Sequence, residues 1–292
     1  MPSLRQIKTK ISSVRGTRRI MSAMKLISAV KLQRVQGPLI ASRPYSDAFA
    51  ELARNLASVC DPSLHPLLRV PEEKKRLHVV FMTSDRGLCG SFNSNLIRKL
   101  ETYLVTEASQ YEEVTFRFLG RRGRDHFRRL GYTVIDSYTG TNERNFTQTA
   151  RAISSALTEE FSDGRIDDVV LVYNFFISAL RQETIFERLL PIERHEPDEG
   201  LGVDYIFEPD RADVLEAVLP EYVRARVERA VFETITSEHA ARMAAMDSAT
   251  RNADEVVRQL TLLFNKTRQA YITKELMDIV NGTEALKKGG AV

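Results

Sequence analysis

The C-terminal part of the chain alternates apolar and polar residues with the period of an α-helix. Residues 221–281 contain no Gly or Pro, and Gly282 then supplies a C-terminal stop. A helix of about sixty residues is roughly 90 Å long, too long to be covered by one small domain. The apolar spacing of three and four therefore predicts a coiled-coil seam in which the methionines are packing residues. The predicted seam comprises Val223, Val227, Val231, Ile235, Met243, Met246, Val256, Leu260, Leu263, Leu276, Ile279 and Val280.

The N-terminal residues show the same period. Gly16 weakens this helix, and Gly37-Pro38 is expected to kink it before the helical pattern continues to residue 59. Pro220 should likewise kink or break the start of the C-terminal helix, which Asp210 marks. No other predicted element is long enough to pair with either helix, so residues 1–59 and 210–286 are expected to form an antiparallel coiled coil. Its N-terminal seam comprises Leu4, Ile7, Ile11, Val14, Met21, Met24, Ile27 and Val35.

Between the two helices the period changes from 3.6 to 2. Segments 76–84, 114–120, 132–138 and 167–177 are rich in β-branched and aromatic residues, which predicts strands. They alternate with helical patterns at 92–108, 121–130 and 145–161, and this order predicts a mostly parallel sheet with covering helices. Segment 182–192 is expected to add an edge strand, and 193–210 to be a loop. Residues 70–209 are thus predicted to form a central α/β domain.

One loop of this domain invites comparison with phosphate-binding loops. "TSDRGLCGSFNSN" (83–95) joins a predicted strand to a predicted helix, as such loops do. Gly87 and Gly90 lack the Lys-Ser/Thr of a Walker loop and the spacing of a dinucleotide fingerprint. Cys89 has no nearby His to act as its base, so it is expected to be packed rather than reactive. We therefore interpret the loop as a tight turn in which Asn93 or Ser94 caps the next helix.

The net charge of +3 conceals a strong asymmetry. No Asp or Glu precedes Asp47, and a solvated helix face would normally carry both signs. The basic stretch favours a partner, either nucleic acid, an anionic membrane or an acidic protein surface, or else a transit peptide. Its basic residues are Arg5, Lys8, Lys10, Arg15, Arg18, Arg19, Lys25, Lys31, Arg34 and Arg43.

Other classes of site find little support in the sequence. The cysteines, Cys60 and Cys89, indicate a reducing compartment, and the longest apolar run, 169–177, is too short to span a bilayer. The histidines have no metal-ligand spacing, and "RHEPDEG" lacks that of a calcium loop. "GRRGRDHFRRLG" (120–131) concentrates arginines that could contact nucleic acid, but it offers no aromatic stacking platform. No catalytic, cofactor or metal site is predicted.

Several longer motifs are specific to one family. They are "RIMSAMKLISAVKL" and "ASRPY" near the start, "TSDRGLCGSFN" in the middle, "YIFEPD" before the last helix, and the gap-free segment from "SEHAARMAAM" to "MDIVNG". Through them the chain closely resembles the gamma-subunit family of F-type ATP synthases. The resemblance implies a non-catalytic central rotor shaft whose central α/β domain, residues 70–209, is Rossmann-like and lies between the two helices of the rod. Such a shaft turns inside a ring of three alpha and three beta subunits and couples proton flow through the c-ring to ATP synthesis at the beta-subunit sites.

The resemblance also implies partners and contact residues. The partners would be the alpha, beta and epsilon subunits and the c-ring, with one copy of this chain per complex and no nucleic acid. The chain would be peripheral, at the cytoplasmic face of a bacterial inner membrane, and held there only through the complex. An acidic loop of the beta subunit would then be the partner of the basic N-terminus. The implied contacts are Met24, Arg242, Arg268, Gln269, Thr273 and Glu275 with beta subunits, and Tyr205 and Glu208 with the c-ring.

Two rival hypotheses come from other classes. A nucleic-acid-binding coiled-coil protein would explain the basic N-terminus but not the long C-terminal motif. An independent enzyme is the weaker rival, because no catalytic constellation was found. Co-purification with alpha and beta subunits would favour the shaft, whereas nucleic acid alone would favour the first rival.

Overall fold

The structure is a computed structural model that describes residues 3–71, 73–194 and 207–289, with side chains as far as residue 283. By its internal contacts the chain divides into two units. One unit comprises residues 1–27 and 245–292, and the other comprises residues 28–244. The two long helices each contribute to both units, so each unit is considered by itself.

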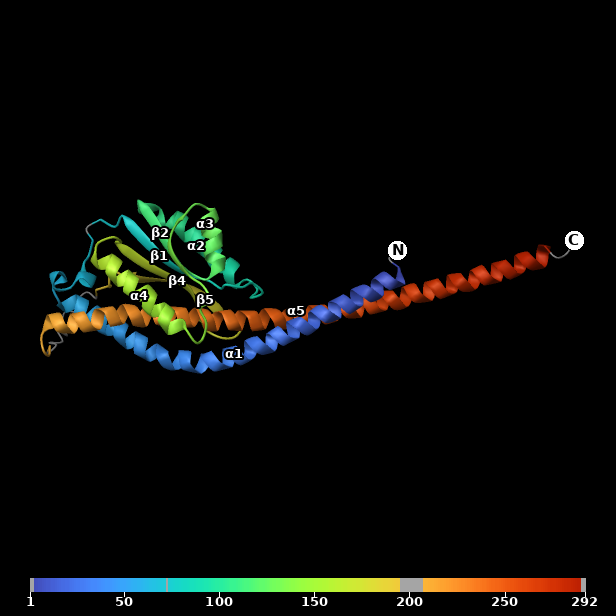
Figure 1. The fold of residues 1–292 in the computed structure, drawn as a ribbon, viewed down its shortest axis with the longest axis horizontal. Coiled ribbons are helices and arrows are strands. Elements are labelled where there is room, and N and C mark those ends of the chain that lie inside the picture. Colours follow the sequence, from blue (N-terminus) through green and yellow to red (C-terminus); the bar gives the residue numbers. More distant parts are fainter. Residues whose placement is uncertain (1–2, 72, 195–206, 290–292) are drawn as a thin grey trace. The chain divides into compact units, whose positions relative to one another are not determined.

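A five-stranded sheet forms the centre of the larger unit, in the order β3-β2-β1-β4-β5 (Figure 1). Strands β1 to β4 are parallel, and β5 pairs antiparallel with β4 at the edge. The predicted parallel sheet and its added edge strand are both confirmed. The strands are β1 (Arg76–Met82), β2 (Glu113–Leu119), β3 (Thr133–Tyr138), β4 (Asp168–Phe176) and β5 (Gln182–Leu190).

Both faces of this sheet are covered. Along β1, Val79 and Phe81 pack against the helices α2 and α3, whereas Val80 and Met82 belong to the core on the other face, beneath α4 and the long helices. This period of two sends alternate side chains to opposite faces, and both faces are apolar because both are covered. The covering helices are α2 (Phe92–Thr106), α3 (Arg121–Arg129) and α4 (Phe146–Ser162), and short 3₁₀ turns lie at Pro62–Leu64, Pro66–Leu68 and Ala108–Gln110.

The two long helices are α1 (Leu4–Val59) and α5 (Arg211–Gly289). The expected break at Pro220 is wrong, since α5 continues through this proline, as α1 does through Pro38 and Pro44. A proline inside a helix costs about 3 kcal/mol, but the turns around these prolines bury side chains such as Leu39 and Leu219 completely. Within the larger unit α1 is curved but not interrupted (Figure 1). Tertiary packing therefore outweighs the local propensity.

In each unit the two helices lie antiparallel. In the larger unit Arg43 pairs with Glu233, and Tyr45 donates a hydrogen bond to Glu221. In the smaller unit Lys25 pairs with Asp247 at 2.6 Å, and Arg18 pairs with Asp254. As residue numbers rise along α1 they fall along α5, which is the expected direction of pairing.

Candidate functional site

The loop between β1 and α2 is braced by its own side chains. Asn93 accepts a hydrogen bond from the Ser84 amide at 3.0 Å and donates to the Ser84 hydroxyl at 2.7 Å and the Cys89 sulfur at 3.3 Å. The capping prediction for Asn93 and Ser94 is wrong, because the N-cap of α2 is Ser91, which makes no side-chain cap bond. Leu88 is held at a φ of 64°, a strained value for a bulky residue. The Asn93 side chain braces the loop instead of capping the helix, and the Ser94 hydroxyl donates to the carbonyl oxygen of Ser91 at 3.2 Å.

Backbone amides beside this loop are bound by the chain's own carboxylate. Asp85 follows β1, and its two oxygens accept from the amides of Arg121 at 3.0 Å and Gly140 at 2.6 Å. The first of these amides lies at the N-terminus of α3, where an anion is favoured. Cys89 is 2% exposed, and burial raises the pKa of its thiol. Cys89 is therefore packed within the loop, as the sequence predicted.

The two motifs singled out in the central domain line one cleft of about 1010 Å³. Residues 87–90 form one wall, and Arg122, Arg128 and Arg129 of α3 lie opposite. The only acid in the lining, Asp125, is paired with Arg124 at 2.8 Å. His126 is the only aromatic side chain there, so the cleft lacks the stacking rings that single-stranded nucleic acids need.

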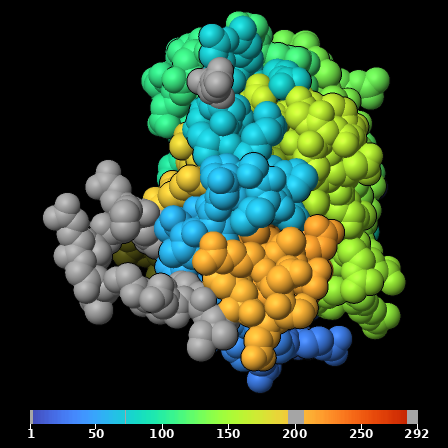
Figure 2. Space-filling view, turned by 90° about the vertical axis from the view of Figure 1, so that its left-hand side faces the viewer, coloured from blue at the N-terminus to red at the C-terminus, as the bar shows by residue number. Residues whose placement is uncertain are grey.

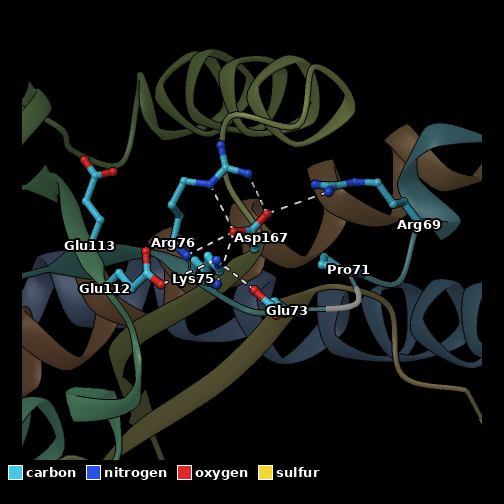
Figure 3. Close-up of a pocket in the computed structure, with 8 residues that line it drawn as sticks. All are labelled: Arg69, Pro71, Glu73, Lys75, Arg76, Glu112, Glu113 and Asp167. Atoms are coloured by element: carbon cyan, nitrogen blue, oxygen red, sulfur yellow. Dashed lines mark hydrogen bonds and ion pairs between the residues drawn. The ribbon is translucent and has the colours of Figure 1, made fainter.

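A second pocket, of about 490 Å³, lies at the amino ends of the strands and is drawn in Figure 3. Its centre is Asp167, which receives a two-pronged contact from Arg76, with distances of 3.0 and 2.8 Å. Burial alone would raise the pKa of Asp167, but the hydrogen bonds from Arg76 and the backbone hold it below its ordinary value. Lys75 is likewise engaged, with Glu73 and Glu112. These charges satisfy one another and tie the segment before β1 to the sheet.

Part of the basic N-terminal stretch is neutralised within the chain. Four of its residues have acidic partners on other elements: Arg18 with Asp254, Lys25 with Asp247, Lys31 with Glu143, and Arg43 with Glu233. A single external partner for the whole stretch is therefore not required. Arg5, Lys8, Lys10, Arg15, Arg19 and Arg34 make no ion pair with any described residue and remain available.

Two of the implied beta-subunit contacts differ in their surroundings. Met24 lies on α1 in the smaller unit and is half-buried, one residue before the Lys25 ion pair with Asp247. Arg242 lies on α5 in the larger unit, where its side chain is only 12% exposed and pairs with Glu238 at 2.6 Å. Arg242 also approaches the carbonyl oxygen of Gly87 at 3.5 Å. Its guanidinium is therefore already engaged within the chain.

The other implied contacts lie where α5 extends beyond the first residue of α1. The register set by the ion pairs at Lys25 and Arg18 places Leu4, the first residue of α1, opposite Arg268. Beyond it α5 continues without a helix partner in this unit, as Figure 1 shows. Arg268, Gln269, Thr273 and Glu275 are exposed, and none makes an ion pair or side-chain hydrogen bond with a described residue.

In this segment of α5 the predicted coiled-coil seam is wrong. Its apolar side chains are exposed rather than packed on α1, because α1 does not extend far enough to cover them. Ile27 of α1 is also exposed, at 58%, whereas Ile7 is buried. In the larger unit the seam is confirmed, since Val223, Val227 and Val231 are fully buried. The exposed side chains of the segment are Tyr271 (57%), Ile272 (44%), Leu276 (57%), Met277 (56%), Ile279 (61%) and Val280 (51%).

The implied c-ring contacts fall at the start of α5. Glu208 is exposed and makes no ion pair with a described residue, and Tyr205 lies outside the described residues. Figure 2 shows the first turns of α5 (orange) beside the segment that follows α1 (light blue), and His65 lies 3.3 Å from Glu216 there. Sequence reasoning did not anticipate this contact, because nothing in the local pattern links the two segments.

Within the described ranges, two further kinds of site find no counterpart. No described helix is both long and apolar enough to cross a membrane. The described His, Cys, Asp and Glu side chains form no group of three or more that could hold a metal ion.

The chain is similar to known proteins over nearly its whole length. The family model described as ATP synthase matches residues 3–286. The ATP synthase gamma chain of Anaeromyxobacter sp. (strain Fw109-5) is 44% identical over 292 residues, covering 98% of this chain and 100% of the relative. The gamma chain of Nitratidesulfovibrio vulgaris is 41% identical over 290 residues, covering 98% and 100%.

Two solved structures share the fold. A chain of the Euglena gracilis mitochondrial ATP synthase (OSCP/F1/c-ring, rotational state 3) has a TM-score of 0.71 at 18% identity, covering 99% of this chain and 96% of that one. A chain of the Tetrahymena thermophila mitochondrial ATP synthase (central stalk/c-ring) has a TM-score of 0.58 at 22% identity, covering 79% and 99%.

Proposed function

The chain belongs to the family of ATP synthase gamma chains, non-catalytic subunits of the complex, and from that premise we propose that it is the rotor shaft that couples proton flow to ATP synthesis. The shaft turns inside the ring of alpha and beta subunits. Because its surface is asymmetric, it contacts each beta subunit differently and biases each catalytic site towards a different conformation. Differential contact of this kind is what any allosteric drive requires.

The observation that carries this proposal is the uncovered end of α5. A single helix in water is marginal, and one that exposes Leu276, Ile279 and Val280 together needs a cover. The cover cannot be α1, which starts opposite Arg268. A close-fitting ring of partner subunits would bury these side chains.

Arg268 and Gln269 mark the level at which that ring would grip the shaft. Both are exposed and without partners among the described residues. Inside a protein collar water is partly excluded, so a guanidinium there needs a carboxylate or carbonyl partner. A loop of a beta subunit that hydrogen-bonds both side chains would supply it. Thr273 and Glu275 follow on the same uncovered segment.

We assign the contact with the c-ring to the start of α5. Glu208 is exposed beside the sheet domain, and Tyr205 precedes it in the sequence. Polar contacts of these residues with the loops of the c-ring would transmit rotation to the shaft. The epsilon subunit would bind the same part of the rotor. The chain would then be a single-copy peripheral subunit at the cytoplasmic face of a bacterial inner membrane.

Rotation can be observed directly with one labelled position. Val105 on α2 is 76% exposed, whereas Cys60 and Cys89 are 4% and 2% exposed, so a Val105→Cys thiol would be labelled selectively. In an assembled catalytic head fixed to a surface, a probe on this residue should rotate in one direction when ATP is added. A probe that stays still while the head hydrolyses ATP would rule out the rotor assignment.

A further inference from the structure

Helix α5 buries a run of polar side chains where it crosses the end of β4. Thr234 and Thr236 bond the carbonyls four residues earlier in their own helix, at 2.8 and 2.9 Å. Ser237 instead donates to the carbonyl oxygen of Asn174 in β4 at 3.0 Å. Glu233 is 0% exposed and also reaches out of the helix. Thr234 also donates to the sulfur of Met82 in β1 at 3.7 Å, so three members of the run, Glu233, Thr234 and Ser237, connect α5 to the sheet, and of these only Glu233 is charged.

The carboxylate of Glu233 joins three elements. Arg43 of α1 reaches its two oxygens at 2.8 and 2.9 Å, and the amide of Phe176 at the end of β4 donates to it at 2.9 Å. The same guanidinium donates to the carbonyl oxygen of Phe176 at 2.6 Å and lies 4.3 Å from the centre of the Phe175 ring. Arg229, whose own partner is Asp47, lies 3.9 Å from Glu233.

A buried ion pair of this kind is weak evidence for stability. Moving two charges out of water costs about as much as their attraction returns, and apolar residues of similar volume often serve as well. What such a pair can add is a unique arrangement, because a shift of one element would leave a charge unpaired. The surrounding apolar contacts, such as Leu39 against Phe232 and Phe176, have no comparable directional preference.

We propose that Arg43 and Glu233 are positioning residues that hold α1 at one placement against α5 and the end of β4. The proposal rests on the rotor function: torque received at the sheet domain reaches the shaft only if the domain cannot slip along or around the two helices. The pair serves this purpose because the fork of Arg43 contacts both other elements at once, through Glu233 and through the carbonyl of Phe176. Neither residue touches a catalytic site.

The test removes both charges together, so that neither is left buried without its partner. In Arg43→Met/Glu233→Gln, the Gln oxygen still accepts from the amide of Phe176, and the Met side chain still packs on Phe175. The assembled complex should keep its melting temperature within about 4 °C, because both charges leave together. ATP hydrolysis by the head should be unchanged, whereas protons pumped per ATP should fall to about half or less, because a displaced arrangement of similar energy becomes populated.

Two further variants make every outcome decisive. Arg43→Lys keeps a charge but lacks the fork, so it should assemble and pump at an intermediate ratio. Tyr45→Phe removes a 2.8 Å hydrogen bond between the same two helices without touching β4, and it should pump like the wild type. Wild-type pumping in the double variant would overturn the proposal. So would a melting temperature lowered by much more than about 4 °C, since the pair would then serve stability. Failure of the rotor function would show separately, as a wild-type complex whose Val105 probe does not turn.

Discussion

The two units use the same pair of helices in opposite ways. In residues 28–244 the facing surfaces of α1 and α5 are packed on each other and on the sheet, with Val223, Val227 and Val231 fully buried. In the smaller unit Ile27, Leu263 and Leu276 are 58%, 43% and 57% exposed, and the last turns of α5 have no helix beside them. The first region is stabilised by its own chain. The second region has the surface of a helix that partners must cover.

The largest expected difference between the two regions comes from one matched pair of substitutions. Leu219→Ala removes a fully buried side chain and should lower the free energy of unfolding of the purified chain by about 2–5 kcal/mol. Leu276→Ala, at 57% exposure, should change it by less than about 0.5 kcal/mol but weaken assembly with the catalytic head. Denaturant titration measures the first effect, and co-purification with the head measures the second. Equal destabilisation of the isolated chain would contradict the comparison.

The packed region should also lose stability in acid. Burial, with the nearby Lys31 and Arg242, lowers the pKa of His239 to about 4, although Glu143 opposes this. Because this pKa lies below the unfolded value of 6.5, the unfolded chain binds the proton first as pH falls. The contribution of the neutral His239 side chain to the free energy of unfolding is fully present above about pH 6.5. It decreases as the pH falls to about 4, by up to about 1.4 kcal/mol per pH unit.

Unfolding of the purified chain at several pH values checks this. His239→Gln should flatten the dependence between about pH 6.5 and 4, where the wild-type imidazole titrates. An unchanged slope in the variant would show that other groups are responsible.

Substitutions in the uncovered region should change the activity of the assembled complex but not the stability of the isolated chain. Arg268→Ala and Gln269→Leu should each reduce both ATP synthesis and hydrolysis, because the grip is used in both directions of rotation. A charge-assisted hydrogen bond contributes about 1.5–3 kcal/mol, equivalent to roughly tenfold or more in the population of one rotary state. The double variant should cost less than the two singles together, since both side chains contact one loop. Full activity in the double variant would remove this grip from the mechanism.

A smaller effect is expected at Met24, which is half-buried in the same unit. Met24→Lys should leave assembly intact but lower the number of protons pumped per ATP by a few-fold. The reason is that a new ion pair with an acidic beta-subunit loop would stabilise one rotary state over the others by about 1 kcal/mol. Substitutions at Arg242, Gln269, Thr273 or Glu275 should compensate. Normal pumping in Met24→Lys would show that the residue does not face that loop.

The smallest effect is expected at the exposed Glu208, beside the packed region. Glu208→Lys should impair proton-driven ATP synthesis by about twofold, as for one exposed charge, and leave hydrolysis by the detached head unchanged. Parallel assays of membranes and of the released head make the comparison. An equal fall in both activities would place the defect in the shaft rather than at the c-ring.

Some features of the molecule followed from the sequence alone because they depend on local periodicity. The strands alternate with period two and the helices with period 3.6, so the order of elements and the edge position of β5 were predicted from the chain. The signature motifs likewise identified the family. Local chemistry also predicted that Cys89 would be packed rather than reactive.

What the sequence could not determine depends on residues far apart in the chain. The apolar repeat at Leu276 and Ile279 looks the same as that at Val223 and Val227, but only the two valines pack into the core that the long helices share with the sheet. Pro220 was expected to interrupt its helix, but packing around Leu219 kept it continuous. Asp85 and Asn93 found their partners across a turn or on another element. Burial and long-range pairing arise only when the chain folds, whereas a sequence pattern records local preference alone.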